Sequence, residues 1–325
     1  MSKQQVSFFW FRRDLRLEDN VGLFHALKSK YTVIPLFIFD DAILDSLPYN
    51  DPRVGFIYEN LSKINTQLLK IESALLVKKG KTLAVWELLL TEFDIKEVFF
   101  NKDYEPYAIK RDSAICELLE TNNAITFSFK DQVIFEEKEI TKADGLPYTV
   151  YTPFKNKWLE KYKSMAPVLE YDATDVFSNF HKCDFVFPSL EQIGFEKSPI
   201  KVKPHNLKFI ANYQDIRDFP ALDQTSYLSP HLRFGTVSIR KLVNWAFHKN
   251  DVFLSELIWR EFFMQILFSF PKVVTQNFKT AYDGIKWRNN EADFQRWCSG
   301  TTGYPMVDAG MRQLNETGFI HNRVR

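Results

Sequence analysis

The first 130 residues of the chain alternate between short β-like runs and amphipathic helical segments. The β-like runs, rich in valine, isoleucine and phenylalanine, are residues 6–11, 32–39, 74–77, 97–100 and 125–129. Helical spacing of apolar residues is clearest over residues 54–68 and 106–119. Strand–helix–strand repetition requires right-handed crossovers, so we predict an α/β domain with a doubly wound parallel sheet. In such a sheet a ligand binds beyond the carboxyl ends of the strands.

Glycine placement argues against the two commonest nucleotide-binding loops of such sheets. The first 150 residues contain only Gly22, Gly55, Gly80 and Gly145, so neither GxGxxG nor GxxxxGK[ST] occurs there. An ordinary dehydrogenase or a P-loop ATPase is therefore disfavoured.

The second half of the chain has a different pattern. Residues 162–206 contain four prolines and little periodicity, which indicates a long connector over the surface. Helical patterns follow at residues 206–215, 239–249, 253–268, 291–298 and 305–317. With 325 residues the chain exceeds what one hydrophobic core usually serves. We therefore expect an α/β domain over residues 1–130, a connector over 131–206 and a mostly helical domain over 207–325.

Charge and composition narrow the class of protein. The net charge is +1, but residues 1–150 carry 19 basic and 23 acidic side chains, and the remainder carries 23 and 18. An anionic partner would thus dock on the second half, unless the small imbalance is chance. The longest apolar run, residues 33–39, is too short to span a membrane. Three distant cysteines without CxxC spacing fit a reducing cytoplasm, with no disulfide framework and no zinc site.

Three clusters could carry chemistry. On a helix over residues 253–268, Glu256, Trp259, Arg260 and Phe263 share one face, which suits a flat heteroaromatic ligand with a phosphate. The alternative is an ordinary amphipathic helix with a Glu256–Arg260 pair.

The hydroxyls of residues 225–229 precede another helical run and could cradle a phosphate or simply cap that helix. The run His321-Asn322-Arg323-Val324-Arg325, which follows a Gly303-Tyr304-Pro305 segment, could hold a phosphate or a base edge, or be a frayed basic terminus.

These clusters, read with the start of the chain, resemble the photolyase and cryptochrome family. Seven strings occur in the family's order. They are WFRRDLRLEDN from residue 10, NKDYEPYAIKRD from 101, TPFKNKW from 152, RDFPALDQTSYLSPHLRFG from 217, ELIWREFF from 256, RWCSGTTGYPMVDAGMRQL from 296 and GFIHNRVR from 318. The resemblance covers the whole chain, and seven ordered strings are highly specific.

The resemblance implies a Rossmann-like antenna domain followed by a helical domain that binds FAD. Members bind UV-damaged DNA, flip a pyrimidine dimer out of the duplex and split it with an electron from light-excited reduced FAD. It also implies an antenna chromophore, for which we expect methenyltetrahydrofolate, and a monomeric protein. The basic second half suits the DNA backbone.

Residue roles follow by motif from the resemblance. The implied FAD contacts are Tyr213, Thr225, Ser226, Tyr227, Leu228, Ser229, Phe253 and Arg325, and Glu105 is the implied antenna residue. Tyr227 departs from the Arg or Lys of many relatives, which removes one charged phosphate contact. The implied DNA and lesion contacts are Arg217, Glu256, Trp259, Arg260, Phe263, Asn322 and Arg323. Glu256 would hydrogen-bond the dimer and stabilise its negative charge, Trp259 would stack on it, and Trp297 would relay electrons to the flavin.

The last residues indicate the subclass. His321-Asn322-Arg323-Val324-Arg325 resembles the HNRxR of photolyases that act on cyclobutane dimers. A blue-light-sensing cryptochrome that binds FAD without repair is the alternative, and a non-catalytic nucleotide or DNA binder is a third. Relatives continue past this motif, so we expect a C-terminally truncated flavin domain with weak FAD retention and little or no repair. A flavin absorbance band near stoichiometric occupancy would contradict that expectation.

Overall fold

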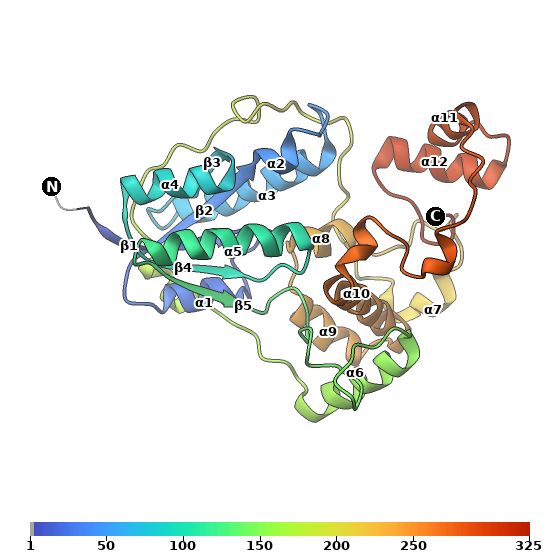
Figure 1. The fold of residues 1–325 in the computed structure, drawn as a ribbon, viewed down its shortest axis with the longest axis horizontal. Coiled ribbons are helices and arrows are strands. Elements are labelled where there is room, and N and C mark those ends of the chain that lie inside the picture. The colour runs from blue at the N-terminus through green and yellow to red at the C-terminus, as the bar shows by residue number, and fades with distance from the viewer. Residues whose placement is uncertain (1–2) are drawn as a thin grey trace.

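The computed structural model describes residues 3–325, whose first half is an α/β layer and whose second half is helical (Figure 1). Five strands form one sheet in the order β3-β2-β1-β4-β5. They are β1 (Gln5–Phe11), β2 (Val33–Asp40), β3 (Leu76–Gly80), β4 (Asp94–Asn101) and β5 (Ile125–Phe129). Every neighbouring pair is parallel, which confirms the predicted doubly wound sheet.

Helices cover both faces of this sheet. They are α1 (Val21–Leu27), α2 (Asp41–Leu44), α3 (Pro52–Leu69), α4 (Thr82–Glu92) and α5 (Pro106–Thr121). Successive side chains of a strand point to opposite faces. Phe9 and Phe11 of β1 accordingly pack in one core with α1 and α3, and Phe8 and Trp10 pack in another with α4 and α5. A strand buried on both faces is mostly apolar, which is why β1 and β2 read as nearly continuous apolar runs.

The second half contains the remaining helices of the described chain. They are α6 (Tyr151–Met165), α7 (Tyr213–Ile216), α8 (Leu228–Phe234), α9 (Ile239–Phe247), α10 (Asp251–Ser269), α11 (Glu291–Ser299) and α12 (Pro305–Thr317). Short 3₁₀ turns lie at η1 (Thr174–Asn179), η2 (Ile210–Asn212), η3 (Pro271–Val274) and η4 (Thr280–Tyr282). One apolar core joins α6, α9 and α10. Among residues 3–325, no helix combines the length and apolar character that a membrane crossing requires.

Two expectations need correction. The helix expected over residues 206–215 is wrong, because the chain forms only η2 and the four-residue α7 there. Ile210 is the one residue of those two elements that is buried, so no apolar stripe supports a longer helix.

The expected connector over residues 131–206 is not uniform. It contains α6, whose Phe154, Trp158 and Tyr162 recur every four residues and are buried in the helical core. Later in this segment, Phe180 and Phe195 pack into a core of the α/β half. The segment therefore contributes to both halves of the protein.

A buried ion network joins the two halves. Arg16 Nη2 lies 2.8 Å from Asp131 Oδ1, and Arg240 Nη2 of α9 lies 2.9 Å from the same oxygen and 3.0 Å from Asp19 Oδ2. Burial by itself would raise the pKa of Asp131, but the two guanidinium groups hold it below its usual range. This network fixes α9 against the carboxyl ends of β1 and β5.

Candidate functional site

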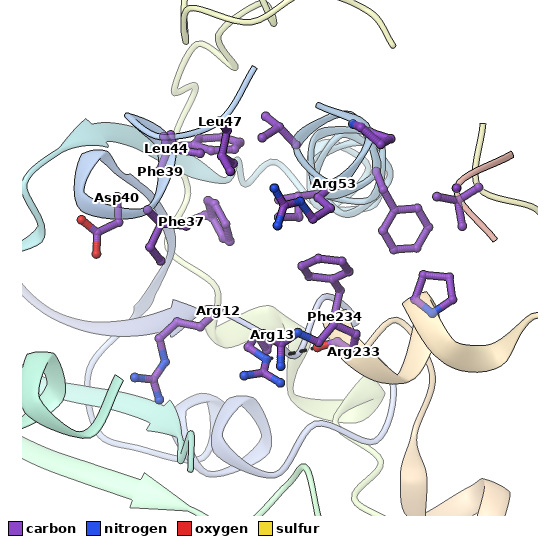
Figure 2. Close-up of a pocket in the computed structure, with 18 of the residues that line it drawn as sticks. Arg12, Arg13, Phe37, Phe39, Asp40, Leu44, Leu47, Arg53, Arg233 and Phe234 are labelled. Atoms are coloured by element: carbon purple, nitrogen blue, oxygen red, sulfur yellow. Dashed lines mark hydrogen bonds between the residues drawn. The ribbon is translucent and has the colours of Figure 1, made fainter. Parts of the chain in front are cut away.

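A large cavity lies at the carboxyl ends of β1 and β2 and is also lined by residues of α3, of α8 and of the end of α12 (Figure 2). Its volume is about 750 Å³. Its wall combines apolar side chains with arginines, among them Phe37, Phe39, Leu44, Leu47, Phe234, Arg12, Arg13, Arg53 and Arg233. The cavity is therefore formed by both halves, at the edge of the sheet where a parallel sheet places its ligand.

Glu105, the expected antenna residue, lies on the wall of this cavity. Arg13 Nη1 is 3.0 Å from Glu105 Oε1, and Arg233 also donates a hydrogen bond to that oxygen. Burial opposes ionisation, yet these two arginines hold the pKa of Glu105 below its ordinary value. Glu105 is therefore an ionised carboxylate that already has two cationic partners.

Asp40 and Tyr107 form a polar pair in the same cavity that the sequence reasoning did not identify. The Tyr107 hydroxyl donates to Asp40 Oδ2 at 2.5 Å, and burial followed by this bond raises the pKa of Tyr107 to about 12. The backbone N–H of Ala42 donates to the other Asp40 oxygen at 3.2 Å. The sequence feature that could have identified this pair is Asp40, the single acidic residue at the carboxyl end of the otherwise apolar strand β2.

The hydroxyl groups of residues 225–229, which precede α8, do not all serve to cap that helix. Tyr227 is the N-cap residue, has a left-handed backbone (φ 52°) and makes no side-chain capping bond. The Thr225 hydroxyl is buried and has no hydrogen-bond partner within residues 3–325. An unpartnered buried hydroxyl is costly, and a phosphate oxygen would satisfy it. The segment thus fits the diphosphate of a flavin dinucleotide.

The other expected flavin residues lie in different surroundings. Tyr227 and Ser229 face the large cavity, and Lys203 Nζ lies 3.0 Å from the Tyr227 hydroxyl oxygen. Leu228 is buried in the helical core. The rings of Tyr213 and Phe253 meet edge to face at 5.3 Å in that core.

Four side chains of alternating charge form a chain of ion pairs, here called the charge chain, in the order Glu256, Arg217, Asp218 and Arg323. Arg217 Nη1, after α7, lies 2.7 Å from Glu256 Oε1 of α10. Arg217 Nε lies 3.7 Å from Asp218 Oδ1, which also pairs with Arg323. Folding therefore brings Arg217, which was expected to contact DNA, together with Glu256 and Arg323, which were expected at the lesion. The Glu256–Arg260 pair considered from the helical spacing is replaced by the Glu256–Arg217 pair.

The aromatic residues of α10 lie beside this charge chain, but Arg260 does not. Trp259 is partly buried and stacks on the exposed Phe263 ring, with centroids 5.4 Å apart. The Arg260 guanidinium donates instead to the carbonyl oxygens of Gln132, at 2.7 Å, and Leu232, at 3.3 Å. Burial, together with the charge of Arg13, lowers the pKa of Arg260 to about 10. Arg260 thus contacts the backbone between the two halves.

The end of the chain places the last expected residues. Arg325 Nη2 donates to Asn322 Oδ1 at 3.0 Å, and His321 is buried. Trp297 is about half-exposed and stacks on Phe294 with ring centroids 5.8 Å apart. The Trp297 indole therefore lies at the surface of the described structure.

Comparison with known families covers both halves. Residues 7–174 match the family described as DNA photolyase, and residues 253–325 match the family described as FAD binding domain of DNA photolyase. A deoxyribodipyrimidine photo-lyase of Halobacterium salinarum is 34% identical, over 98% of this chain and 73% of that protein.

Two solved structures are similar over nearly the whole chain. A class III photolyase from Agrobacterium tumefaciens superposes with a TM-score of 0.83 at 29% identity, covering 100% of this chain and 72% of the other. A photolyase from Sulfolobus tokodaii, solved with two FAD molecules that implied a novel light-harvesting cofactor, gives a TM-score of 0.77 at 32% identity. That match covers 99% of this chain and 73% of the other.

Proposed function

The chain belongs to the DNA photolyase family, and we propose that it repairs UV-damaged DNA by splitting cyclobutane pyrimidine dimers with light energy. The observation that carries this proposal is the charge chain from Glu256 through Arg217 to Arg323 beside Trp259. Folding brings these residues together from three separate segments, namely the residues after α7, helix α10 and the end of the chain.

The charge chain suits a dimer that becomes negatively charged. Glu256 can accept hydrogen bonds from the N–H edges of the bases, and Arg217 fixes its carboxylate at 2.7 Å. Arg217 and Arg323 supply positive charge that stabilises negative charge developing on the dimer. Trp259 offers an indole for stacking, which contributes about 1–3 kcal/mol per base in single-strand binding.

FAD, when bound and reduced, supplies the electron for the reaction. We propose that the hydroxyls of Thr225 and Ser226 bind its diphosphate, because the Thr225 hydroxyl is buried without another partner in the described chain. Tyr213, Phe253 and Arg325 remain predicted flavin contacts.

We propose further that the large cavity holds the antenna chromophore. A volume of about 750 Å³ accommodates a flat heteroaromatic ring. Asp40 can accept from an N–H edge of that ring, and Arg13, Arg53 and Arg233 can bind an anionic tail. Glu105 lies on this wall, so methenyltetrahydrofolate remains the expected ligand. Mass spectrometry of the extracted chromophore tests this assignment, and a second flavin would refute the folate.

We also propose that the protein acts as a monomer in the cytoplasm. The three cysteines are free thiols, which supports a reducing compartment. Light scattering on the purified protein tests the oligomeric state.

The test of the main proposal is light-dependent loss of dimers from a UV-irradiated oligonucleotide. FAD and a reductant are supplied in excess, so that flavin loading and reduction do not limit the reaction. We expect repair under blue light, none in the dark, and a loss of at least about tenfold in Glu256→Gln. Equal dimer loss in the light and in the dark would contradict the proposal. FAD binding and dimer binding with no repair under any illumination would favour a cryptochrome.

A further inference from the structure

Trp259 is stacked on a residue from a distant part of the chain. The ring centroids of Tyr151 and Trp259 lie 3.5 Å apart, and their planes differ by 9°. Tyr151 is the first residue of α6, and Trp259 lies in the middle of α10. One face of the Trp259 indole is therefore stacked against a phenol ring.

Tyr151 is itself held in place by α10. Its hydroxyl donates to the carbonyl oxygen of Ser255 at 2.8 Å and lies 2.6 Å from the Ser255 hydroxyl oxygen. Ser255 precedes Trp259 by one helical turn. The Tyr151 ring also meets Phe262 edge to face at 5.8 Å. The hydroxyl and the ring are both anchored, so Tyr151 has little freedom to move relative to Trp259.

The anchoring of α6 does not depend on Tyr151. Phe154, Trp158 and Tyr162 are buried in the helical core and carry the packing of this helix. Tyr151 is only partly buried and is preceded by the exposed Val150. Its specific contacts are therefore directed to Trp259 and to the helix that carries Trp259.

We propose that Tyr151 is a positioning residue that fixes the Trp259 indole in one rotamer, in which it stacks on a flipped base. This inference rests on the proposed function, because Trp259 is the expected stacking surface for the dimer. The Phe263 ring, which is largely exposed, also stacks on the Trp259 indole, with the two ring planes inclined by 23°. An indole held in one orientation loses less side-chain freedom when a base stacks on it.

The experiment compares Tyr151→Ala, Tyr151→Phe and the control Tyr148→Ala in the full chain. Tyr148 is a partly buried tyrosine of the preceding segment that packs on Phe154. The first readout is the ¹⁹F NMR signal of Trp259 in protein labelled with 5-fluorotryptophan, assigned with Trp259→Phe. The second is the Kd for dimer-containing DNA relative to undamaged DNA.

We expect Tyr151→Ala to shift and broaden the Trp259 signal and to weaken dimer binding by about 3- to 10-fold, with unchanged binding of undamaged DNA. Tyr151→Phe keeps the stacked ring and should restore most of the dimer affinity. If Tyr151→Ala does not fold, Tyr151→Leu preserves side-chain volume without the aromatic face and takes its place.

The outcomes separate this inference from the proposed function. A Trp259 signal and a dimer affinity that match those of Tyr148→Ala would overturn the inference. A shifted signal with unaltered dimer affinity would overturn it as well. A shifted signal in a protein that does not prefer dimer DNA would support the positioning by Tyr151 and overturn the proposed function.

Discussion

Replacing Arg240 with methionine should loosen the contact between the two halves of the protein. Arg240 is buried, and its Nε lies 3.1 Å from both carboxylate oxygens of Asp19 while Nη2 lies 2.9 Å from Asp131 Oδ1. Methionine preserves most of the stem volume but removes the charge. Asp131 would keep Arg16, whereas Asp19 would keep only neutral donors such as the backbone N–H of Tyr171.

The expected cost follows from this geometry. Removing one partner of a buried ion pair costs about 3–5 kcal/mol, because the remaining charge is left uncompensated. The unfolding entropy of globular proteins is about 2 cal/mol/K per residue, so this cost lowers the Tm of a chain of this length by about 4–7 °C. Differential scanning calorimetry at pH 7 measures the shift.

The matched control is Lys241→Met, one residue further along α9. Lys241 also reaches across to the first half, where it pairs with Glu18, but both side chains are more exposed. Exposed pairs contribute about 0–1 kcal/mol, so the control should melt within about 2 °C of the parent chain. If the Tm of Arg240→Met equals that of Lys241→Met, the idea that the buried network holds the two halves together is refuted.

Three further predictions concern single residues. Burial raises the pKa of Glu261 from 4.5 to about 7. Between pH 4.5 and about 7 the folded state therefore binds more protons than the unfolded state. Its contribution of roughly 3 kcal/mol is therefore present below pH 4.5 and is lost as the pH rises through 7, and urea unfolding of Glu261→Gln should lack this dependence. Thr225→Val should weaken FAD binding about tenfold in a flavin titration without lowering the Tm of the flavin-free protein, because the removed hydroxyl has no partner in the described chain. Asp40→Asn should reduce antenna chromophore content, measured by absorbance after extraction, and leave the FAD content unchanged.

The sheet could be predicted from sequence because its signal is local. A strand buried on both faces is apolar at most positions, and β1 and β2 show this without knowledge of their neighbours. Helix α6 was missed although its Phe154, Trp158 and Tyr162 recur every four residues. The stripe is only three residues long and is interrupted by several lysines, and its burial against α9 and α10 is a tertiary contact that local sequence does not show.

The pairs that build the sites could not be derived from local patterns. Tyr107 and Asp40 are 67 positions apart, and Tyr151 and Ser255 are 104 apart. Periodicity places each residue on a face of its own element, but it does not say which other element will lie opposite. The resemblance to a family supplied residue roles without this geometry, so it named Trp259 and did not name Tyr151.

Arg260 shows where helical spacing fails even within one element. Spacing of three or four positions correctly places the Cβ atoms of residues 256, 259, 260 and 263 along one stripe. Short or rigid side chains such as those of Trp259 and Phe263 stay close to that stripe, and their rings do stack. The Arg260 stem is long enough to carry its guanidinium to the carbonyl oxygens of Gln132 and Leu232. Glu256 pairs instead with Arg217, which follows α7, so the charge beside the aromatic face is set by tertiary contacts.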